Sequence, residues 1–187
     1  MVGKTLNPFP EIKGTMALVG NAKSILGKDW GEEIDSHDNV IRFGDAITEG
    51  HEKQVGSKET HRFLCYPANK DISCETKMDG KKIFLMSANL LLLFEGVRRL
   101  VNRNEIYFIS SDFRIACNNL TGKTSSLGMM AIQGFLDYKP DLYGFDFFKT
   151  LHYYQELKLG PGMFHDWDRE RRITEDLHNK GLVNWKV

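Results

Sequence analysis

Cysteine is scarce in this sequence, and long apolar runs are missing from it. Its 187 residues include three cysteines, Cys65, Cys74 and Cys117, without the paired spacing of a zinc site or a redox C-x-x-C motif. We therefore expect free thiols and a reducing compartment. No apolar segment follows a basic start as in a signal peptide, and the apolar run at residues 90–94 is far too short to span a bilayer. The chain as given is expected to be soluble and cytoplasmic.

An excess of charge of either sign is also missing. Lys plus Arg equal Asp plus Glu at 25 each, so no whole-molecule field attracts the chain to nucleic acid or to an anionic membrane, although local clusters still could. Repeats, low-complexity tracts and Pro/Ser-rich linkers are absent from the sequence. With 41% hydrophobic residues, the chain is expected to form one domain over residues 1–187, with 1–12 as an entry arm.

Apolar runs and amphipathic segments alternate along the chain, which is typical of a parallel sheet covered by helices. The candidate strands are residues 16–19, 39–43, 61–65, 83–86, 106–109, 142–145 and 182–185. Helix signals lie at residues 89–102, 126–138 and 166–179, the last closed by Gly181. The pattern predicts an α/β fold: a single-domain, Rossmann-like parallel sheet of about seven strands flanked by helices.

Gly20 and Asn21 directly follow the first predicted strand. In doubly wound α/β sheets, ligands bind at the carboxyl ends of the strands, near the N-termini of helices. A glycine there lets the backbone approach a ligand closely, and the Asn21 amide offers both donors and an acceptor to a phosphate or sugar. For these two residues alone, a plain strand-ending turn is the alternative.

A much longer set of residues carries a family resemblance. The set comprises VGN at 19–21, Gly31, IDSHD at 34–38, Val40, Arg42, VGSK at 55–58, TH at 60–61, YP at 66–67, SSLG at 125–128, DLYGF at 141–145, HYY at 152–154, and His165, Asp166 and Glu170. In order and nearly in spacing, it resembles the long, short, third and very short motifs of the eukaryotic-type sialyltransferases. The resemblance runs from about residue 16 to the C-terminus.

The resemblance implies an inverting glycosyltransferase whose Rossmann-like fold is a variant of the GT-A fold. It implies a CMP-sugar donor, carrying sialic acid or a related sugar, a glycan hydroxyl as acceptor, no cofactor and no metal. The chemistry agrees with the absence of a metal, since a single leaving phosphate can be stabilised by histidine, amide and backbone donors. Asp166 and Asp168 form the one Asp-x-Asp of the sequence, a spacing that binds a metal in other glycosyltransferases, and they lie within the histidine motif.

The resemblance also implies roles for individual residues. His165 is the candidate general base, because histidine titrates near neutral pH, and His152 is the candidate donor to the leaving phosphate. The expected donor-binding residues are Gly20, Asn21, Ser125, Ser126, Gly128 and Tyr153. The expected supporting residues are Asp35, His37, Arg42 and Glu170. Asp35 and His37 are expected in a turn network, with His37 also a candidate neighbour of the donor. Arg42 is expected to pair with one of the carboxylates at 35–38.

The sequence departs from the family where Gly44 and Asp45 replace an asparagine that usually contacts the donor phosphate. The chain is also short for the family, which is typical of a viral, phage or bacterial member. Two alternatives stay open at this point. One is transfer from another nucleotide sugar to a hydroxylated DNA base, with Arg169, Arg171 and Arg172 meeting phosphates. The other is a non-catalytic module that binds a nucleotide sugar.

Overall fold

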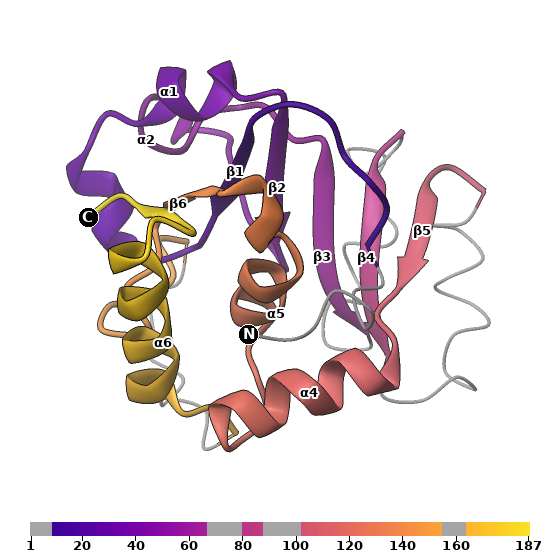
Figure 1. Ribbon diagram of the computed structural model, residues 1–187. Coiled ribbons are helices and arrows are strands. Elements are labelled where there is room, and N and C mark those ends of the chain that lie inside the picture. Colours follow the sequence, from indigo (N-terminus) through magenta and orange to yellow (C-terminus); the bar gives the residue numbers. More distant parts are fainter. Residues whose placement is uncertain (1–8, 67–79, 88–101, 155–163) are drawn as a thin grey trace.

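The strands form one parallel sheet. The computed structural model describes residues 9–66, 80–87, 102–154 and 164–187. All paired strands run parallel, in the order β5-β4-β3-β2-β1-β6-β7 (Figure 1). The strands are β1 (Met16–Val19), β2 (Asn39–Phe43), β3 (His61–Tyr66), β4 (Lys82–Ser87), β5 (Glu105–Phe108), β6 (Asp141–Tyr143) and β7 (Asn184–Trp185). The predicted fold class is confirmed.

Helices connect the strands on both faces of the sheet. They are the 3-10 helix η2 (Lys23–Gly27), α1 (Gly31–Ser36), α2 (Glu52–Val55), α4 (Ser111–Thr121), α5 (Leu127–Gly134), the 3-10 helix η6 (Leu136–Tyr138) and α6 (Trp167–Asn179). Helix α4 was not predicted from the sequence. The predicted helix at 126–138 is divided, because Phe135 leaves helical geometry at φ −113° and ψ 17°. The predicted helix at 89–102 lies almost wholly outside the described residues.

The strand order reverses between β1 and β6. From β1 the chain builds the sheet outward through β2, β3, β4 and β5, and it then returns to place β6 on the other side of β1. The connections leaving β1 and β6 therefore diverge from neighbouring strand ends. This leaves a crevice at the carboxyl edge of the sheet, which is where ligands bind in doubly wound folds.

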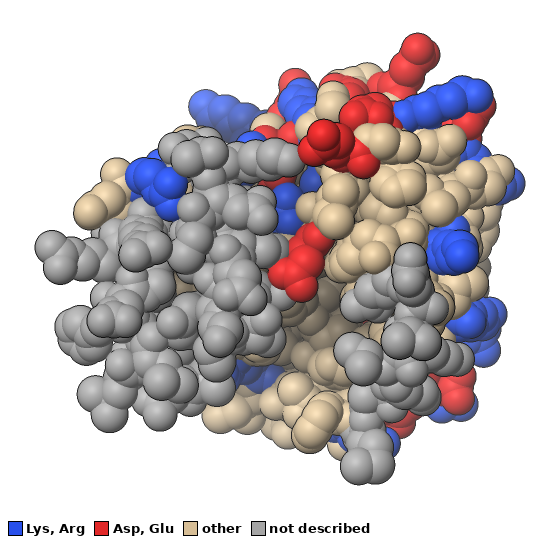
Figure 2. All heavy atoms as spheres, turned by 180° about the vertical axis from the view of Figure 1, so that it is seen from behind, with Lys and Arg blue, Asp and Glu red and all other residues tan. Residues whose placement is uncertain are grey.

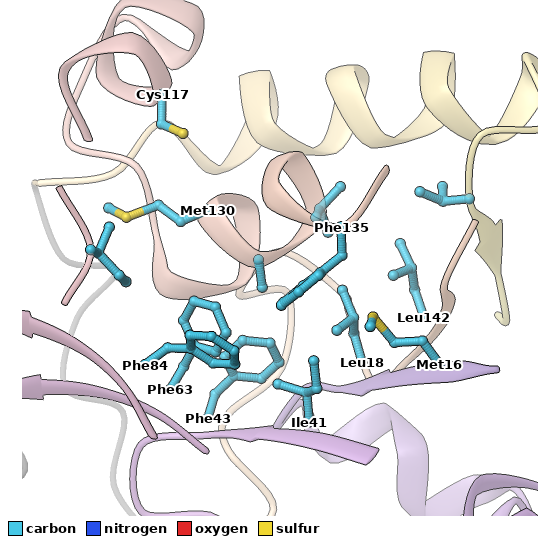
Figure 3. Close-up of a cluster of buried hydrophobic side chains, with 14 of the residues drawn as sticks. Met16, Leu18, Ile41, Phe43, Phe63, Phe84, Cys117, Met130, Phe135 and Leu142 are labelled. Atoms are coloured by element: carbon cyan, nitrogen blue, oxygen red, sulfur yellow. The ribbon is translucent and has the colours of Figure 1, made fainter. Parts of the chain in front are cut away.

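The core lies on both faces of the sheet because side chains alternate along each strand. Met16 and Leu18 of β1 face a cluster with residues of α4, α5 and α6, whereas Ala17 and Val19 face a smaller cluster with α1 and α2. Figure 3 shows the larger cluster, in which side chains from the sheet and from the helices point toward one another. Phe9 from the predicted entry arm stacks on Phe135, with ring centroids 4.7 Å apart, so this part of the arm packs on the core.

Two of the predicted strands are shorter than expected. Gly144 adopts a left-handed φ of 66° and ends β6, so the prediction of strand through residue 145 was wrong. Gly181, at φ 66°, closes α6: its N–H donates to the carbonyl of His178 at 2.9 Å, and the Leu182 N–H donates to that of Leu177 at 3.0 Å. These bonds form a Schellman cap, which delays the start of β7 to Asn184.

Candidate active site

A cavity of about 300 Å³ lies at the crevice between β1 and β6. The loops that leave β1, β2 and β6 meet there with the starts of α5 and α6. The lining residues are Gly20, Asn21, Ala22, Phe43, Gly44, Asp45, Ser126, Leu127, Gly128, Gly144, Phe145, Asp146, Phe147, Phe148, Thr150, His152, Tyr154, His165, Trp167 and Glu170. Seven of them come from the sequence-predicted site: Gly20, Asn21, Ser126, Gly128, His152, His165 and Glu170. Segments far apart in the sequence thus converge on one cavity.

Figure 2 shows the molecule from the side opposite to Figure 1. Charged side chains of both signs gather at the top of this face, where α1 and α2 lie in Figure 1. The hollowed middle of the face is lined mostly by uncharged residues.

Glycines bring the two central loops together at this edge. A Cβ on Gly20 would lie 2.4 Å from the carbonyl oxygen of Gly144, and one on Gly144 would lie 2.6 Å from that of Gly20. Gly20 was expected to let the backbone approach a ligand, but what it approaches directly is the backbone of Gly144. A Cβ on Gly128 would lie 2.8 Å from Cε1 of Phe145, so α5 also packs closely here.

Asn21 joins the first loop to the third-motif segment. Its Nδ2 donates to the carbonyl of Phe43 at 2.9 Å and to Oη of Tyr154 at 3.2 Å. Its backbone carbonyl accepts the N–H of Tyr153 at 3.0 Å, and Ala22 and His152 form an antiparallel bridge. The Asn21 Oδ1 is buried without a hydrogen-bond partner among the described residues. The Asn21 side chain therefore links two walls of the cavity, and its Oδ1 is available to accept a hydrogen bond from a ligand.

His152 is half-buried in the cavity wall. Burial lowers the pKa of its imidazole, while the carboxylates of Asp45 and Asp146 oppose that shift. Its Nδ1 is buried and has no hydrogen-bond partner in the part of the chain that the structure describes. An imidazole in this environment gains from a bound anion, because an anion would both favour its charged form and accept a hydrogen bond.

His165 is oriented by the backbone of another loop. Its Nδ1 lies 2.7 Å from the carbonyl oxygen of Thr124. A carbonyl oxygen only accepts hydrogen bonds, so Nδ1 carries the proton, and the neutral ring has its lone pair on Nε2. The ring also contacts Trp167, with centroids 4.7 Å apart. The geometry thus gives His165 the tautomer that a proton acceptor needs.

Glu170 lies one turn into α6, is 1% exposed, and binds the start of α5. Its Oε1 accepts the Ser126 N–H at 2.8 Å and its Oε2 accepts the Ser126 hydroxyl at 2.7 Å. Ser126 also caps α5, because its Oγ accepts the N–H of Met129 at 3.1 Å. Burial raises the pKa of Glu170, while the Ser126 bonds and nearby His165 counteract the shift. The contact supports the expectation that Glu170 orients the His165 segment.

Ser125 and Tyr153 do not line the cavity. Ser125 is buried behind it, where its N–H donates to Oδ1 of Asn118 at 2.8 Å and its Oγ lies 2.9 Å from Oγ1 of Thr121. The Tyr153 hydroxyl donates to the carbonyl of Ile47. Both residues shape the loops from behind, whereas the neighbouring Ser126 and Tyr154 reach the cavity.

Asp35 and Arg42 hold a turn and do not line the cavity. The Asp35 carboxylate accepts the N–H and hydroxyl of Ser57 at 2.8 and 2.9 Å and the N–H of Lys58 at 2.9 Å. Arg42 is fully buried and donates to the carbonyls of Val55 and Lys58 at 2.8 and 3.0 Å. The expected pairing of Arg42 with a carboxylate at 35–38 was wrong: its Nε and Nη2 donate to backbone carbonyls, and its Nη1 has no hydrogen-bond partner among the described residues.

His37 lies at the amino edge of the sheet, opposite the cavity. Its Nδ1 bonds the carbonyl of Glu33 at 2.9 Å, and its Nε2 lies 3.4 Å from Oδ2 of Asp141, the first residue of β6. The cavity is at the carboxyl edge, so His37 is not a neighbour of any ligand bound there. The expected turn network is present, since the Ser36 hydroxyl also donates to Glu33 and Asp38 binds Thr15.

Sequence reasoning missed the aromatic lining of the cavity and the place of Asp45. Phe148, Tyr154 and Trp167 all line it, next to the two histidines. Tyr154 and Trp167 lie within matched motifs, and proximity to His152 and His165 was the signal that could have found them. Asp45 was noted only as a departure from the family, yet it lines the cavity near His152.

Metal ligands and membrane spans were also sought in the described residues. Within them, no group of three His, Cys, Asp or Glu side chains is placed to hold a metal ion. Asp166 is the N-cap of α6 and accepts the Arg169 N–H at 3.0 Å. None of the helices in the described ranges is both long and apolar enough to cross a bilayer.

A parallel sheet with a cavity at its switch point, where two histidines and the starts of two helices meet, defines a Rossmann-like fold with a candidate ligand site. Residues 10–95 match the model of glycosyltransferase family 29 (sialyltransferase). The mammalian sialyltransferase crystallised with Gal-beta-1-3GalNAc-ortho-nitrophenol has a similar fold, with a TM-score of 0.75 and 24% identity over 92% of this chain and 68% of that one.

Curated relatives match over a shorter stretch. Beta-galactoside alpha-2,6-sialyltransferase 2 of Bos taurus is 54% identical over 56 residues, which are 30% of this chain and 11% of the relative. CMP-N-acetylneuraminate-beta-galactosamide-alpha-2,3-sialyltransferase 2 of Mus musculus is 47% identical over 65 residues, which are 33% and 18%. The matches thus span under a fifth of these relatives' length. The chain is thus similar to sialyltransferases in sequence over residues 10–95 and in fold over most of its length, which confirms the resemblance.

Proposed function

We propose that this chain is an inverting glycosyltransferase that moves sialic acid or a related sugar from a CMP-sugar to a hydroxyl of a glycan. The observation that carries the proposal is the tautomer of His165 at a cavity that also holds His152. In the sialyltransferase resemblance these two histidines are the base and the phosphate donor. The two histidines are 13 positions apart in the sequence and belong to separate segments, and both line the same cavity.

The proton-transfer step follows from the position of the lone pair on His165. Nε2 accepts the proton of the acceptor hydroxyl as its oxygen attacks the anomeric carbon. The bond from that carbon to the phosphate oxygen breaks, and CMP leaves with the bonding electrons. The anomeric centre is inverted because attack and departure occur on opposite sides. The Thr124 carbonyl supports the step by stabilising the imidazolium that forms.

The leaving phosphate is stabilised by His152 and by the start of α5. Ser126 already donates both its N–H and its hydroxyl to Glu170, so the contribution of α5 comes from the first-turn amides of Leu127 and Gly128, which line the cavity. Such amides lack acceptors within the helix and bind anions. With one phosphate to stabilise, these donors replace a metal ion, and the proposed reaction is metal-independent.

The proposed acceptor is a galactoside in a glycan. The bovine relative is named for transfer to beta-galactosides, and the structural neighbour was crystallised with a Gal-beta-1-3GalNAc glycoside. The cytoplasmic location stays a prediction.

Neither alternative has a specific observation in its favour. Of the three arginines considered for DNA binding, Arg171 pairs with Glu175 and Arg169 donates to the carbonyl of Leu120 at 2.9 Å. Arg169 and Arg172 line a separate cavity beside Asp176. A non-catalytic binding module would not need the proton-accepting tautomer of His165.

The test combines ligand binding with turnover. Thermal shifts are measured with CMP, UMP, AMP, GMP, UDP and GDP, with and without EDTA, because ligands of the folded state raise the melting temperature. CMP-sialic acid is then supplied with lactose as acceptor. We expect a shift with CMP that EDTA does not change, and transfer that His165→Ala abolishes while its exposed control His178→Ala does not. A shift only with a diphosphate, lost with EDTA, would refute the proposed donor.

A further inference from the structure

Four rings form a continuous row along one wall of the cavity. The His152 ring meets Phe148 at a centroid distance of 5.9 Å, Phe148 stacks on Trp167 at 5.2 Å and an interplanar angle of 10°, and Trp167 meets His165 at 4.7 Å. All four residues line the cavity. The two aromatic side chains therefore form the wall between the two histidines.

Phe148 is held in a conformation that a bulky side chain rarely adopts. It has a φ of 62°, and its neighbour Phe147 has a φ of 55°. The turn around them is fixed by Asp146, whose Oδ2 accepts the Thr150 N–H at 2.9 Å and the Thr150 hydroxyl. Backbone strain of this kind persists where surrounding contacts over-determine the conformation, often at binding sites. The strain here places Phe148 flat against Trp167.

The indole N–H of Trp167 is unsatisfied within the described part of the chain. Its Nε1 is buried and has no acceptor among the described residues. A buried donor without a partner is destabilising, so such groups are rare in folded proteins and need an explanation. In a cavity wall, the explanation at hand is a ligand oxygen that accepts the bond.

We propose that Trp167, supported by Phe148, binds the acceptor sugar: the indole packs on the apolar face of a pyranose ring and its N–H donates to a sugar oxygen. The inference rests on the proposed function. An aromatic face suits the C–H groups of a pyranose, and a polar handle at the ring edge suits its hydroxyls.

The order of the row identifies the acceptor as the occupant. In an inverting displacement, the acceptor oxygen and the leaving phosphate lie on opposite sides of the anomeric carbon. His165 is at the end that receives the acceptor proton, and His152 is at the end that receives the phosphate. Trp167 adjoins His165, whereas Phe148 adjoins His152. The acceptor ring must therefore lie against Trp167.

The experiment compares Trp167→Phe with wild type and with Trp30→Phe, a control tryptophan whose ring contacts Tyr143 outside the cavity. Trp167→Phe keeps a ring for stacking but loses the N–H. We expect its KM for lactose to rise about threefold to tenfold, as for one lost hydrogen bond, with KM for CMP-sialic acid unchanged. Trp167→Ala, if its melting temperature shows that it folds, should raise the lactose KM further.

A binding measurement separates this inference from the proposed function. Lactose is titrated with CMP present while tryptophan fluorescence is followed. We expect a saturable change in wild type and in Trp30→Phe, and none in Trp167→Phe. Two results would overturn only the proposal that Trp167 binds the acceptor. One is CMP binding together with a lactose signal that survives in Trp167→Phe. The other is a rise in the KM for the donor instead of the KM for the acceptor. Absence of any CMP binding would instead refute the proposed function, and the lactose titration would still report on Trp167.

Discussion

The carboxylate of Glu170 accepts both hydrogen bonds that Ser126 can donate, at 2.8 and 2.7 Å, and so fixes α6 to the start of α5. The two residues are 44 positions apart. The contact sets the spacing between the His165 segment, which leads into α6, and the first-turn amides of α5. A contact between two helices thus positions both the proposed base and the proposed phosphate site.

Glu170→Gln and Glu170→Ala should differ clearly. The glutamine keeps the side-chain volume and an oxygen that accepts the Ser126 N–H, so we expect a loss of unfolding free energy below about 1 kcal/mol. The alanine leaves the partly buried Ser126 N–H without its acceptor, and we expect a loss of about 1–3 kcal/mol together with weaker CMP binding. Urea denaturation and CMP titration measure the two effects. Equal behaviour of the two variants would mean that the Ser126 contacts do not position α5.

The turn that Asp35 holds gives a second prediction, about stability alone. Gly56 has a φ of 69°, and a Cβ there would lie 2.3 Å from Oδ1 of Asp35. Gly50 has a similar φ of 81°, but a Cβ there would meet nothing within 4 Å. Gly50→Ala should lose only about 1 kcal/mol of unfolding free energy from backbone strain, whereas Gly56→Ala should lose at least about 2 kcal/mol because it also displaces Asp35.

Thermal or urea unfolding of both glycine variants checks this, with CMP affinity as the second measurement. The turn residues do not line the cavity, so CMP should bind folded Gly56→Ala as it binds wild type. A variant with full stability and lost CMP binding would place the turn in the ligand site after all.

The sheet was largely predictable because its strands are short apolar runs punctuated by turn residues. β1 and β2 were predicted with their observed bounds, since turn-forming or polar residues flank each run. β6 and β7 were predicted too long because Gly144 and the Schellman cap at Gly181 depend on backbone geometry. Helix α4 was missed although Ser110 caps it and Gly122 follows it, because its sequence is polar around few apolar positions.

The candidate site was predictable in its residue types but not in its contacts. His152, His165 and Asn21 were found because their chemistry and motif order point to a nucleotide-sugar site. The predicted partners of Arg42 were wrong because it binds the backbone carbonyls of Val55 and Lys58, and every residue has such a carbonyl whatever its side chain. The Phe148–Trp167 pair was missed because the two rings, 19 positions apart, stack only after folding.

His61 predicts an acid-sensitive fold. It is 2% exposed, and burial lowers its pKa from the ordinary value of 6.5 to about 4. Between these values the unfolded chain binds a proton that the folded chain does not, so stability is full above pH 6.5 and falls as the pH drops toward 4. We expect this residue to account for about 2–3 kcal/mol of the loss at pH 4.5.

The variant His61→Phe, which keeps a ring against Phe84, removes that titration. Its unfolding free energy should therefore fall less than that of wild type between pH 7.5 and pH 4.5, by about 2–3 kcal/mol. Urea unfolding at the two pH values gives the difference directly. Parallel losses in the two proteins would show that other groups cause the acid sensitivity.

Asp45 should set the pH dependence of donor binding. Burial holds the pKa of His152 below its usual value, and the carboxylate of Asp45 opposes that shift. A protonated His152 binds phosphate more tightly, so CMP affinity should increase as the pH falls through that pKa. Asp45→Asn removes the opposing charge and lowers the pKa of His152 further. The midpoint of the affinity change should move to lower pH, while affinity above pH 7.5 should rise because an anion beside the phosphate is gone.

Calorimetric titration of CMP between pH 5 and pH 8 measures both effects. The CMP phosphate itself titrates with a pKa near about 6, so the informative quantity is the difference between the midpoints of variant and wild type. Asp168→Asn is the matched control: it removes an equal charge from an exposed position on α6, outside the cavity lining, and should leave the midpoint in place. A midpoint that moves equally in both variants would mean that His152 responds to overall charge. Asp45, at the position where the sequence departs from the sialyltransferase motif, would then have no specific part in donor binding.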